Sequence, residues 1–297
     1  MNILIAGGTG FIGKRLSHIL IKNGFRVFIL TRNINKKNII KNATFVDWET
    51  INPELLSSVK VVIKLSGENV AQLWTRSAKK RILDSRVEIT SKLFDFCKNN
   101  EIVPNQLINA SAVGIYGRKD AKYSNESVDE NSKIGDSFLA DVCQKNEQSC
   151  EVFNIFDNIS ILQIRIGVVL TRKFTLLLAL PTIFSIPNPG NKNYYFPWIH
   201  LDDVVGFIYY SIEKKFDGIY NVIGKNLTNH RDFYQILAKN YFGFFPWTLF
   251  LPISLIKSFG DMSEMLLYGP KTSSEKISAS GYNFQHENLK SALKKLP

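Results

Sequence analysis

Three glycines at positions 7, 10 and 13 do the most to limit what this 297-residue chain can fold into. They directly follow Asn2–Ala6, a short apolar segment that is typical of a buried strand. Behind them, apolar side chains recur at helical spacing over residues 11–20. A strand that passes through a glycine-rich turn into a helix opens a βαβ unit, so we expect a parallel sheet from the first residues onward.

Each of the three glycines has a physical reason to be there. We expect Gly7 to permit a sharp turn, Gly10 to let the backbone approach a pyrophosphate, and Gly13 to let the helix pack close to the strand. The N-terminus of that helix offers unpaired N–H groups to phosphates, with Phe11 and Ile12 beside them. The pattern therefore predicts a dinucleotide site, and a glycine turn without a ligand is the alternative.

The end of the second expected strand, Arg26–Leu30, indicates which dinucleotide binds. An NAD site usually has Asp or Glu about 20 residues after the glycines to bind the ribose 2′-OH. This chain has Thr31, Arg32 and Asn33 there instead. A guanidinium group presents a planar fork that matches a phosphate, so we predict NADP(H), with Arg32 on its 2′-phosphate. The alternative, Arg32 as a solvated surface charge, stays open.

Strands and helices alternate through the first 170 residues or so. This alternation predicts an α/β fold of the Rossmann type, a doubly wound parallel sheet with helices on both faces. After about residue 171 the alternation fades, before another strand expected at Tyr194–Ile199. The other expected strands are Ala43–Val46, Val59–Leu65, Gln106–Ala110 and Ser160–Ile166, and the long helices are Thr75–Lys98 and Asp136–Phe156.

The domain boundaries follow from where the alternation stops. We expect a cofactor-binding Rossmann domain over residues 1–170, with residues 194–222 returning to it. A smaller C-terminal substrate lobe and extension would take residues 171–193 and 223–297.

The charge and cysteine content limit the partners and the compartment. The net charge is +11, but lysines and arginines are spread through the chain without a helix-turn-helix, a zinc spacing or an aromatic RNA-binding signature, so we expect no nucleic acid partner. Cys97, Cys143 and Cys150 lack metal-ligand spacing, so no metal is expected. The chain opens directly into a strand, so we expect no secretion signal and a cytoplasmic protein with reduced thiols.

The segment Tyr241–Gly260 is rich in Phe, Leu and Ile and needs a separate check against a membrane span. Pro246 and Pro252 interrupt it, and Lys257 lies near its end. We therefore expect packing in a core or pocket and no membrane insertion, with contact to a membrane surface as the alternative.

Several motifs together resemble one known family. This resemblance is to the extended, atypical short-chain dehydrogenases, in the group labelled epimerase family or nucleoside-diphosphate-sugar epimerase-like, and it covers nearly the whole chain. The tail from Gly260 through Gly281–Phe284 to Leu293 is similar to that group's C-terminal extension of unknown function. The motifs that carry the resemblance are Gly7–Gly13, Leu65–Asn69, Ser85–Arg86, Ser111–Gly117 and Trp198–Val204.

The resemblance implies a set of residues that contact the cofactor. In this family the positions of Thr31 and Arg32 hold the 2′-phosphate, and Leu65–Ser66 passes under the adenosine and ribose. Arg86 lies on a helix whose counterpart reaches the cofactor, although a surface pair with Asp84 or Glu88 is the alternative. The remaining positions that we assign to the cofactor are Gly67, Glu68 and Val168.

The expected catalytic residues depart from the family. Short-chain dehydrogenases use a Tyr that moves a proton, a Lys four residues later, and a Ser. Only Tyr210 and Lys214 have that spacing here, and they come too late in the chain. On the helix where the pair belongs, the aligned positions hold Leu139 and Cys143.

Tyr116, with Ser111 five residues before it, is therefore the best candidate for the acid, and simple packing of Tyr116 in a loop is its alternative. Two hypotheses stay open: an NADP(H)-dependent oxidoreductase or epimerase that acts on a small molecule, and a protein that binds NADP(H) without turnover as a sensor or interaction protein.

Further features bear on the substrate side of the chain. The strand ending at His200 is followed by Asp202 and Asp203, and we interpret one of these two acids as the N-cap of a helix, with His200 as a catalytic base the alternative. Asn146 stands where the family usually has Trp, and Thr171–Phe174 replaces a glycine-rich turn. Because these changes border the expected substrate pocket, the family does not supply the substrate. A homodimer through the two long helices also stays open.

Overall fold

The computed structural model describes residues 1–32, 34, 40–118, 127–179, 186–188, 194–243, 248–250 and 269–297. The chain forms two compact units. Unit 1 consists of Met1–Ser111, Val142–Ile164 and Val205–Tyr220, and unit 2 consists of Ala112–Asp141, Arg165–Val204 and Asn221–Pro297. Over the described residues, no helix is both long and apolar enough to cross a membrane.

A seven-stranded sheet, with most of its residues in unit 1, has the strand order β12-β7-β5-β4-β1-β2-β3. The pairs β1–β2, β1–β4, β2–β3 and β4–β5 are parallel. The strand order therefore reverses beside β1, which is where doubly wound sheets bind ligands. The strands are β1 (Asn2–Ala6), β2 (Arg26–Thr31), β3 (Thr44–Asp47), β4 (Val59–Lys64), β5 (Gln106–Ala112), β7 (Ser160–Ile166) and β12 (Gly218–Val222).

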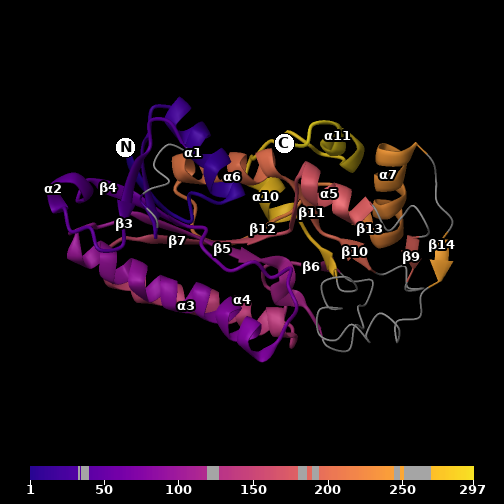
Figure 1. The fold of residues 1–297 in the computed structure, drawn as a ribbon, viewed down its shortest axis with the longest axis horizontal. Coiled ribbons are helices and arrows are strands. Elements are labelled where there is room, and N and C mark those ends of the chain that lie inside the picture. Colours follow the sequence, from indigo (N-terminus) through magenta and orange to yellow (C-terminus); the bar gives the residue numbers. More distant parts are fainter. Residues whose placement is uncertain are drawn as a thin grey trace. The chain divides into compact units, whose positions relative to one another are not determined.

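Helices cover both faces of this sheet. In Figure 1, α1 (Phe11–Lys22) and α6 (Leu201–Lys214) lie on one side, and α3 (Arg76–Asn99) and α4 (Phe138–Ser149) lie on the other. The predicted doubly wound, Rossmann-type sheet is confirmed. Burial of both faces explains why the strands are almost continuously apolar.

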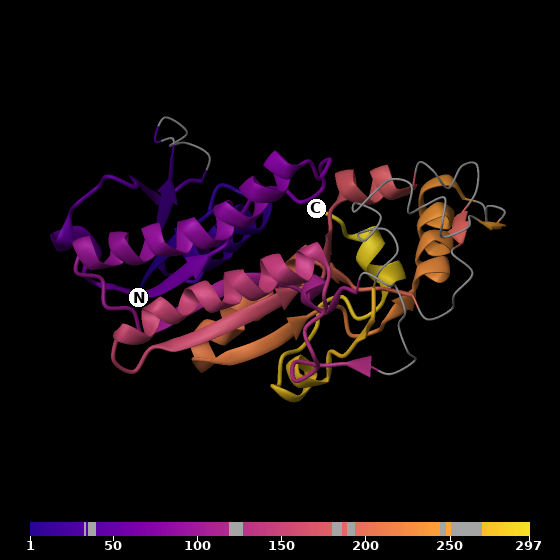
Figure 2. The ribbon, with the colours of Figure 1, turned by 90° about the horizontal axis from the view of Figure 1, so that it is seen from below.

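The core beneath α3 is built from both layers. Apolar side chains of the sheet pack against residues of α3 and of the 3₁₀ helix η3 (Cys150–Ile155), and Figure 2 shows α3 and α4 side by side. The Ser149 hydroxyl at the end of α4 donates to Thr90 Oγ1 on α3 at 2.9 Å. Fully buried members of this core include Leu4, Phe28, Val62, Leu93 and Leu107.

Unit 2 is built from short strand pairs and short helices around an aromatic core in which Phe196 stacks on Phe233 at 3.8 Å between ring centroids. The strand pairs are β8 (Val168–Leu170) with β11 (Trp198–His200), β10 (Tyr195–Phe196) with β13 (Thr228–Asn229), β6 (Ser127–Val128) with β15 (Lys271–Thr272) and β9 (Ile186–Asn188) with β14 (Thr248–Phe250). The helices of unit 2 include η2 (Val113–Tyr116), α5 (Arg172–Ala179), α7 (His230–Phe242), α10 (Glu275–Ala279) and α11 (Leu289–Lys294). The short helix α2 (Pro53–Leu56) belongs to unit 1.

Two expected elements differ from the structure. The helix expected over Asp136–Phe156 is α4 followed by η3, because the last turns tighten to 3₁₀ geometry, as helix ends often do. The strand expected over Tyr194–Ile199 is split into β10 and β11 at Pro197, which has no N–H to donate to a ladder. Most of the apolar segment Tyr241–Gly260 lies outside the described residues.

Candidate functional site

The glycine-rich turn has the shape that the sequence predicts. Gly7 has a φ of +88°, and a Cβ there would lie 2.6 Å from the Ser66 backbone nitrogen. A Cβ on Gly13 would lie 2.5 Å from both the Gly7 carbonyl oxygen and Gly8 Cα. The turn is therefore packed between the start of α1 and the end of β4, and only glycine fits at these two positions.

Within the described residues, no side chain caps the N-terminus of α1. Gly10 is its N-cap residue, without a side chain to cap the helix, and the first turn holds no acidic residue. A Cβ on Gly10 would meet only the Gly7 carbonyl oxygen, at 3.3 Å. Phe11 beside it is 54% exposed. The first N–H groups of this 12-residue helix thus lack a capping side chain, which suits them to an anion.

The turn after β4 is held by Arg86 of α3. Its guanidinium donates to the carbonyl oxygens of Glu68 at 3.1 Å and Ile82 at 2.8 Å, and a Cβ on Gly67 would lie 3.0 Å from its Cζ. Burial lowers the pKa of Arg86. Among the described residues Asp84 pairs with Lys80, and Arg86 pairs with neither Asp84 nor Glu88, so the alternative of a surface pair is wrong.

Glu68 lies at the exposed rim of the same turn. Arg81 donates to its carboxylate at 3.0 Å, and this hydrogen bond is the largest cause that lowers the pKa of Glu68. Gln72 donates to the same oxygen at 3.2 Å, and the charge of Arg32 contributes more weakly to the lowered pKa. Glu68 therefore stays ionised and stabilises the turn after β4.

Two buried hydroxyl groups at the carboxyl ends of adjacent strands lack hydrogen-bond partners among the residues that the structure describes. Ser66 Oγ, two residues past β4, and Ser111 Oγ, near the end of β5, have no partner among the described residues. A buried hydroxyl without a partner costs about 1–3 kcal/mol. Both groups belong to unit 1, at the sheet edge where ligands bind in such folds. They point to a polar ligand that completes their hydrogen bonds.

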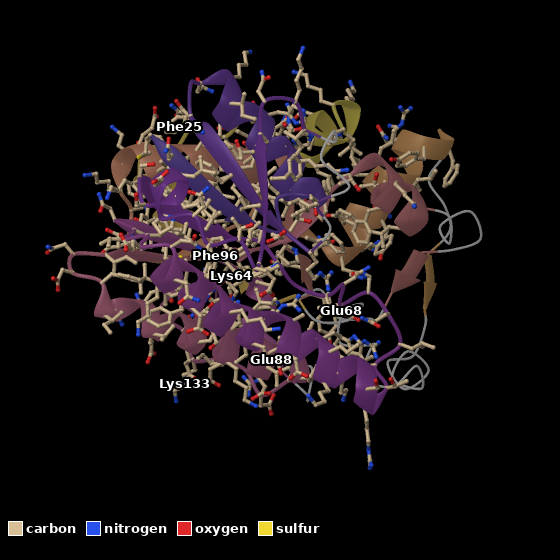
Figure 3. All side chains as sticks on the ribbon, turned by 60° about the vertical axis from the view of Figure 1, so that its left-hand side comes forward. Phe25, Lys64, Glu68, Glu88, Phe96 and Lys133 are labelled. Carbon is tan, nitrogen blue, oxygen red and sulfur yellow. The ribbon has the colours of Figure 1, made fainter. Side chains whose placement is uncertain are left out.

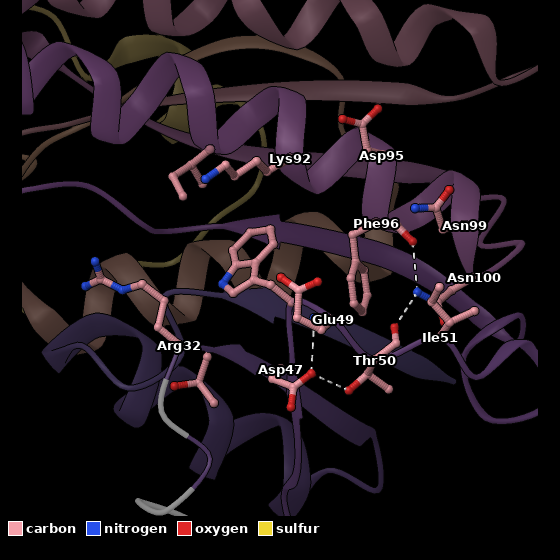
Figure 4. Close-up of a pocket in the computed structure, with 13 residues that line it drawn as sticks. Arg32, Asp47, Glu49, Thr50, Ile51, Lys92, Asp95, Phe96, Asn99 and Asn100 are labelled. Carbon is pink, nitrogen blue, oxygen red and sulfur yellow. Dashed lines mark hydrogen bonds between the residues drawn. The ribbon is translucent and has the colours of Figure 1, made fainter.

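A cavity with a volume of about 520 Å³ lies beside the end of β2 (Figure 4). Asp47 shapes its wall, because its carboxylate accepts from the Glu49 N–H at 3.1 Å and the Thr50 hydroxyl at 2.8 Å. Arg32 is exposed at one end of the group of lining residues, so its guanidinium can receive a phosphate. The lining residues are Thr31, Arg32, Asp47, Trp48, Glu49, Thr50, Ile51, Ile89, Lys92, Asp95, Phe96, Asn99 and Asn100.

Lys64 was not anticipated from the sequence, although it ends an otherwise largely apolar strand. It is 1% exposed and lies inside unit 1 (Figure 3). Its ammonium group donates to Asn146 Oδ1 at 2.6 Å and to Asn109 Oδ1 at 3.2 Å. The only signal in the sequence was that Asn146 stands where the family usually has Trp. That departure now has a structural role, because the amide binds the buried amine.

The catalytic candidate Tyr116 lies in unit 2, within a buried network. Its hydroxyl accepts from Arg165 Nη1 at 2.8 Å and donates to Asn221 Oδ1 at 2.9 Å. The Arg165 guanidinium also lies 5.2 Å from the centroid of the Tyr116 ring. Burial raises the pKa of the Tyr116 phenol, and Arg165 opposes part of that rise. The network gives Tyr116 a clear packing role, and its catalytic role stays a prediction.

The remaining predicted positions are distributed over both units. Val168 lies in β8 of unit 2, where its N–H donates to the Pro197 carbonyl oxygen at 2.7 Å. Leu139 of α4 packs near Gly114, where a Cβ would lie 3.4 Å from Leu139 Cβ. Cys143 of α4 is buried, as are the other two cysteines, and all three are free thiols.

His200 serves as a helix cap. Its Nδ1 accepts from the Asp202 N–H at 3.1 Å at the start of α6, and its Nε2 lies 3.1 Å from the Lys295 carbonyl oxygen. The ligand atoms of His200, Asp202 and His286 lie within 4.8 Å of one another. Both ring nitrogens of His200 face backbone groups, so this geometry favours a structural junction over a metal centre.

Asp202 and Asp203 lie in the first turn of α6, as expected, but the carboxylate of Asp203 binds the C-terminal segment, so Asp203 is not the cap of its own helix. Its carboxylate accepts from the backbone N–H groups of Gln285 at 2.6 Å and His286 at 3.1 Å, and from the Tyr282 hydroxyl at 3.3 Å. Asp203 lies within the first turn of α6, where its side chain is turned to residues 282–286. Sequence reasoning could not find partners about 80 positions away.

Comparison with known proteins gives the family. A profile of the NAD dependent epimerase/dehydratase family matches residues 3–137, and one of the domain of unknown function DUF1731 matches residues 252–296. Epimerase family protein YfhF of Bacillus subtilis (strain 168) is 32% identical over 303 residues, which cover 100% of this chain and 98% of that protein. This chain belongs to the epimerase family. The resemblance inferred from the motifs, including the C-terminal extension, is confirmed.

Other members of the epimerase family are similar over the whole chain. The chloroplastic SDR39U1 homolog of Arabidopsis thaliana is 29% identical, over 99% of this chain and 86% of that protein. The crystal structure of human epimerase family protein SDR39U1 (isoform2) with NADPH has a TM-score of 0.81 at 26% identity, over 99% of this chain and 98% of that one. UDP-glucuronic acid 4-epimerase from Bacillus cereus, with a TM-score of 0.74 at 20% identity, shares the fold.

Proposed function

We propose that this epimerase-family protein binds NADP(H) at the carboxyl edge of the sheet in unit 1 and uses it on a small molecule. The observation that carries the proposal is the pair of buried hydroxyls, Ser66 and Ser111, that lack partners among the described residues. Ribose hydroxyls and a carboxamide can each donate and accept, so such a ligand would complete these hydrogen bonds.

The phosphates have matching groups in the same unit. The N-terminus of α1, which follows the turn at Gly7, would hold the pyrophosphate, because no side chain of the described residues caps it. Arg32, exposed beside the cavity, would hold the 2′-phosphate, and the indole of Trp48 offers an apolar face for the adenine. Thr31, which lines the cavity beside Arg32, and Leu65 and Gly67, in the turn after β4, complete the proposed set. The NADPH in the human SDR39U1 structure supports the choice of NADP(H) over NAD(H).

The reaction class follows from the cofactor. When bound, NADP(H) would supply or accept a hydride, so the substrate is a small molecule with a carbonyl or hydroxyl carbon. We propose unit 2 as the substrate lobe, with Tyr116 and Ser111 as the candidates for proton transfer and carbonyl orientation. The free thiols of Cys97, Cys143 and Cys150 fit a reducing compartment, the cytoplasm.

A second candidate function is binding of NADP(H) without hydride transfer, as a sensor or interaction protein. The observation that favours it is that the Tyr116 hydroxyl is buried and already hydrogen-bonded to both Arg165 and Asn221. In addition, α4 presents Leu139 and Cys143, which cannot act as an acid and an ammonium group. A phenol that already donates and accepts is a poor proton donor to a substrate.

The test is titration of the purified protein with NADPH and NADH, followed by fluorescence, for the wild type and Arg32→Glu. We expect the wild type to prefer NADPH by at least about tenfold and the variant to lose that preference, because a carboxylate repels the 2′-phosphate. Arg26→Glu is the matched control, since Arg26 is exposed at the amino end of β2, whereas Arg32 directly follows its carboxyl end. Equal or tighter binding of NADH by the wild type would overturn the NADP(H) assignment.

The choice between the two functions needs a turnover assay. Stopped-flow absorbance of the NADPH complex with a panel of carbonyl compounds and sugar nucleotides would detect hydride transfer. Oxidation of NADPH by any of them would establish an oxidoreductase, whereas tight binding without oxidation across the panel would favour the sensor.

A further inference from the structure

Lys64 lies next to the glycine-rich turn. It is the last residue of β4 and pairs with Ala6 of β1, the residue directly before Gly7. On its other side it pairs with Asn109 of β5. Lys64 therefore lies at the carboxyl ends of β4 and β1, where we place the cofactor.

The partners of Lys64 are neutral and fixed in orientation. The Asn146 amide nitrogen donates to the Ala110 carbonyl oxygen at 3.0 Å, and the Asn109 amide nitrogen donates to Gln163 Oε1 at 2.6 Å. Both amide oxygens are thereby turned to the ammonium group. Within the part of the chain that the structure describes, no carboxylate pairs with Lys64. Its positive charge is bound by dipoles and is not neutralised.

A second cation adds to the same field. Two ionisable groups interact electrostatically with the Lys64 amine: the guanidinium of Arg86 on α3 and the thiol of Cys150 in η3. Burial lowers the pKa of Lys64 to about 8, and Arg86 contributes to the decrease while Cys150 opposes it. Near neutral pH most molecules therefore carry a buried positive charge on Lys64 and a partly buried one on Arg86.

The unsatisfied hydroxyl of Ser111 lies on the same side of the sheet as this amine. Side chains two residues apart on a strand point to the same face, so Ser111 faces the same way as Asn109, which binds Lys64. Ser111 is nearer to the carboxyl end, where the ligand is expected. Lys64 thus binds on the face of the sheet to which Ser111, where we place a polar ligand, also points.

We propose that Lys64 makes this site select NADPH over NADP⁺, an inference that rests on the proposed binding of NADP(H). The two forms have the same phosphates and riboses and differ by one positive charge on the nicotinamide ring. A fixed positive charge near the ring therefore changes the ratio of the affinities for NADPH and NADP⁺, because it repels only the charged ring of NADP⁺. A unit charge about 10 Å away, at an effective dielectric constant of about 20, changes the affinity for another unit charge by about tenfold.

The experiment measures the dissociation constants of NADPH, NADP⁺ and 2′,5′-ADP for the wild type, Lys64→Gln and Lys60→Gln. Lys60 is the matched control, because it lies on the same strand toward its amino end and is only partly buried. We expect the preference for NADPH over NADP⁺ to fall about tenfold in Lys64→Gln and to be unchanged in Lys60→Gln.

A pH series on the wild type tests the same point without a substitution. The preference should decrease between about pH 7 and about pH 9.5 as the amine loses its proton, because its pKa is about 8. The 2′-phosphate titrates equally in both forms and cancels in the ratio. This series decides the matter if Lys64→Gln does not fold.

Two failures can be told apart. If the wild type binds neither cofactor form nor 2′,5′-ADP, the proposed function fails, and with it the basis of this inference. If all three ligands bind and the ratio of NADPH to NADP⁺ affinity does not change with pH or in folded Lys64→Gln, the role of Lys64 is refuted and the cofactor site stands.

Discussion

Replacement of Gly13 by alanine tests the packing of the glycine-rich turn. The new Cβ would lie 2.5 Å from the Gly7 carbonyl oxygen and from Gly8 Cα, about 1 Å inside a normal contact. Both atoms belong to the backbone, so the start of α1 must shift. Overpacking of this kind costs about 1–3 kcal/mol, and alanine returns up to about 1 kcal/mol of helix propensity. The middle of that cost less the return is a net loss of about 1 kcal/mol, for which we expect a decrease in Tm of roughly 2–4 °C.

Gly10→Ala is the matched control for this prediction. A Cβ on Gly10 would meet one atom within 4 Å, the Gly7 carbonyl oxygen at 3.3 Å, so the fold should tolerate it with little change in Tm. The same methyl group would stand where the backbone has to approach a pyrophosphate. We therefore expect Gly10→Ala to lower NADPH affinity by at least about tenfold while it stays folded.

The assay pairs thermal unfolding without ligand with fluorescence titration of NADPH. Gly13→Ala should lose both stability and binding, and Gly10→Ala should lose binding alone. A wild-type Tm for Gly13→Ala would refute the argument from close packing. Wild-type NADPH affinity in Gly10→Ala would show that the phosphates do not approach the turn at that residue.

Three further predictions concern buried polar groups. Tyr116→Phe should lower the free energy of unfolding by about 1–3 kcal/mol, because it leaves Arg165 without one acceptor. The same substitution should abolish any turnover without a change in NADPH affinity. Retained turnover would exclude Tyr116 as the acid. Asp203→Asn should loosen residues 269–297 and speed their cleavage in limited proteolysis, and unchanged cleavage would contradict its role. The pKa of Lys64 is lower in the folded protein than in the unfolded chain, so its charge destabilises the fold below about pH 8. The free energy of unfolding of the wild type should therefore rise by up to about 3 kcal/mol between about pH 8 and 10.5. An equal rise in Lys64→Gln, measured by denaturant unfolding, would refute this.

Local patterns were sufficient to predict the sheet of unit 1. The strand Ser160–Ile166 was placed with its observed bounds, and β1, β2, β3 and β4 were placed to within a residue at each end. Buried parallel strands are short apolar runs bounded by turns, which makes them easy to recognise. Unit 2 was harder, because its strands are two or three residues long and Pro197 divides one expected strand into two. Such short elements depend on tertiary contacts that no local pattern contains.

The candidate site was predictable only where one segment carries the chemistry. The glycine spacing and Arg32 are local signals, and the structure places them at the start of α1 and beside a cavity. Lys64 and Asn146 are separated by 82 positions, and the fold alone brings the amine to the amide. The same is true of Asp203, whose partners come from the C-terminal segment. Buried polar networks over such separations require the topology to be known first.

The proposed preference for NADPH bears on the kind of reaction. An epimerase that oxidises and then reduces its substrate has to begin from NADP⁺, the form that a buried ammonium group disfavours. A reductase loads NADPH and releases NADP⁺, and the charge of Lys64 would assist both of those steps. A sensor of the reduced cofactor needs the same selectivity and no proton donor, which agrees with the bonded state of Tyr116. Selection by Lys64 would therefore favour a reductase or a sensor over an epimerase, and oxidation of NADPH by the wild type in the presence of a carbonyl compound would separate those two.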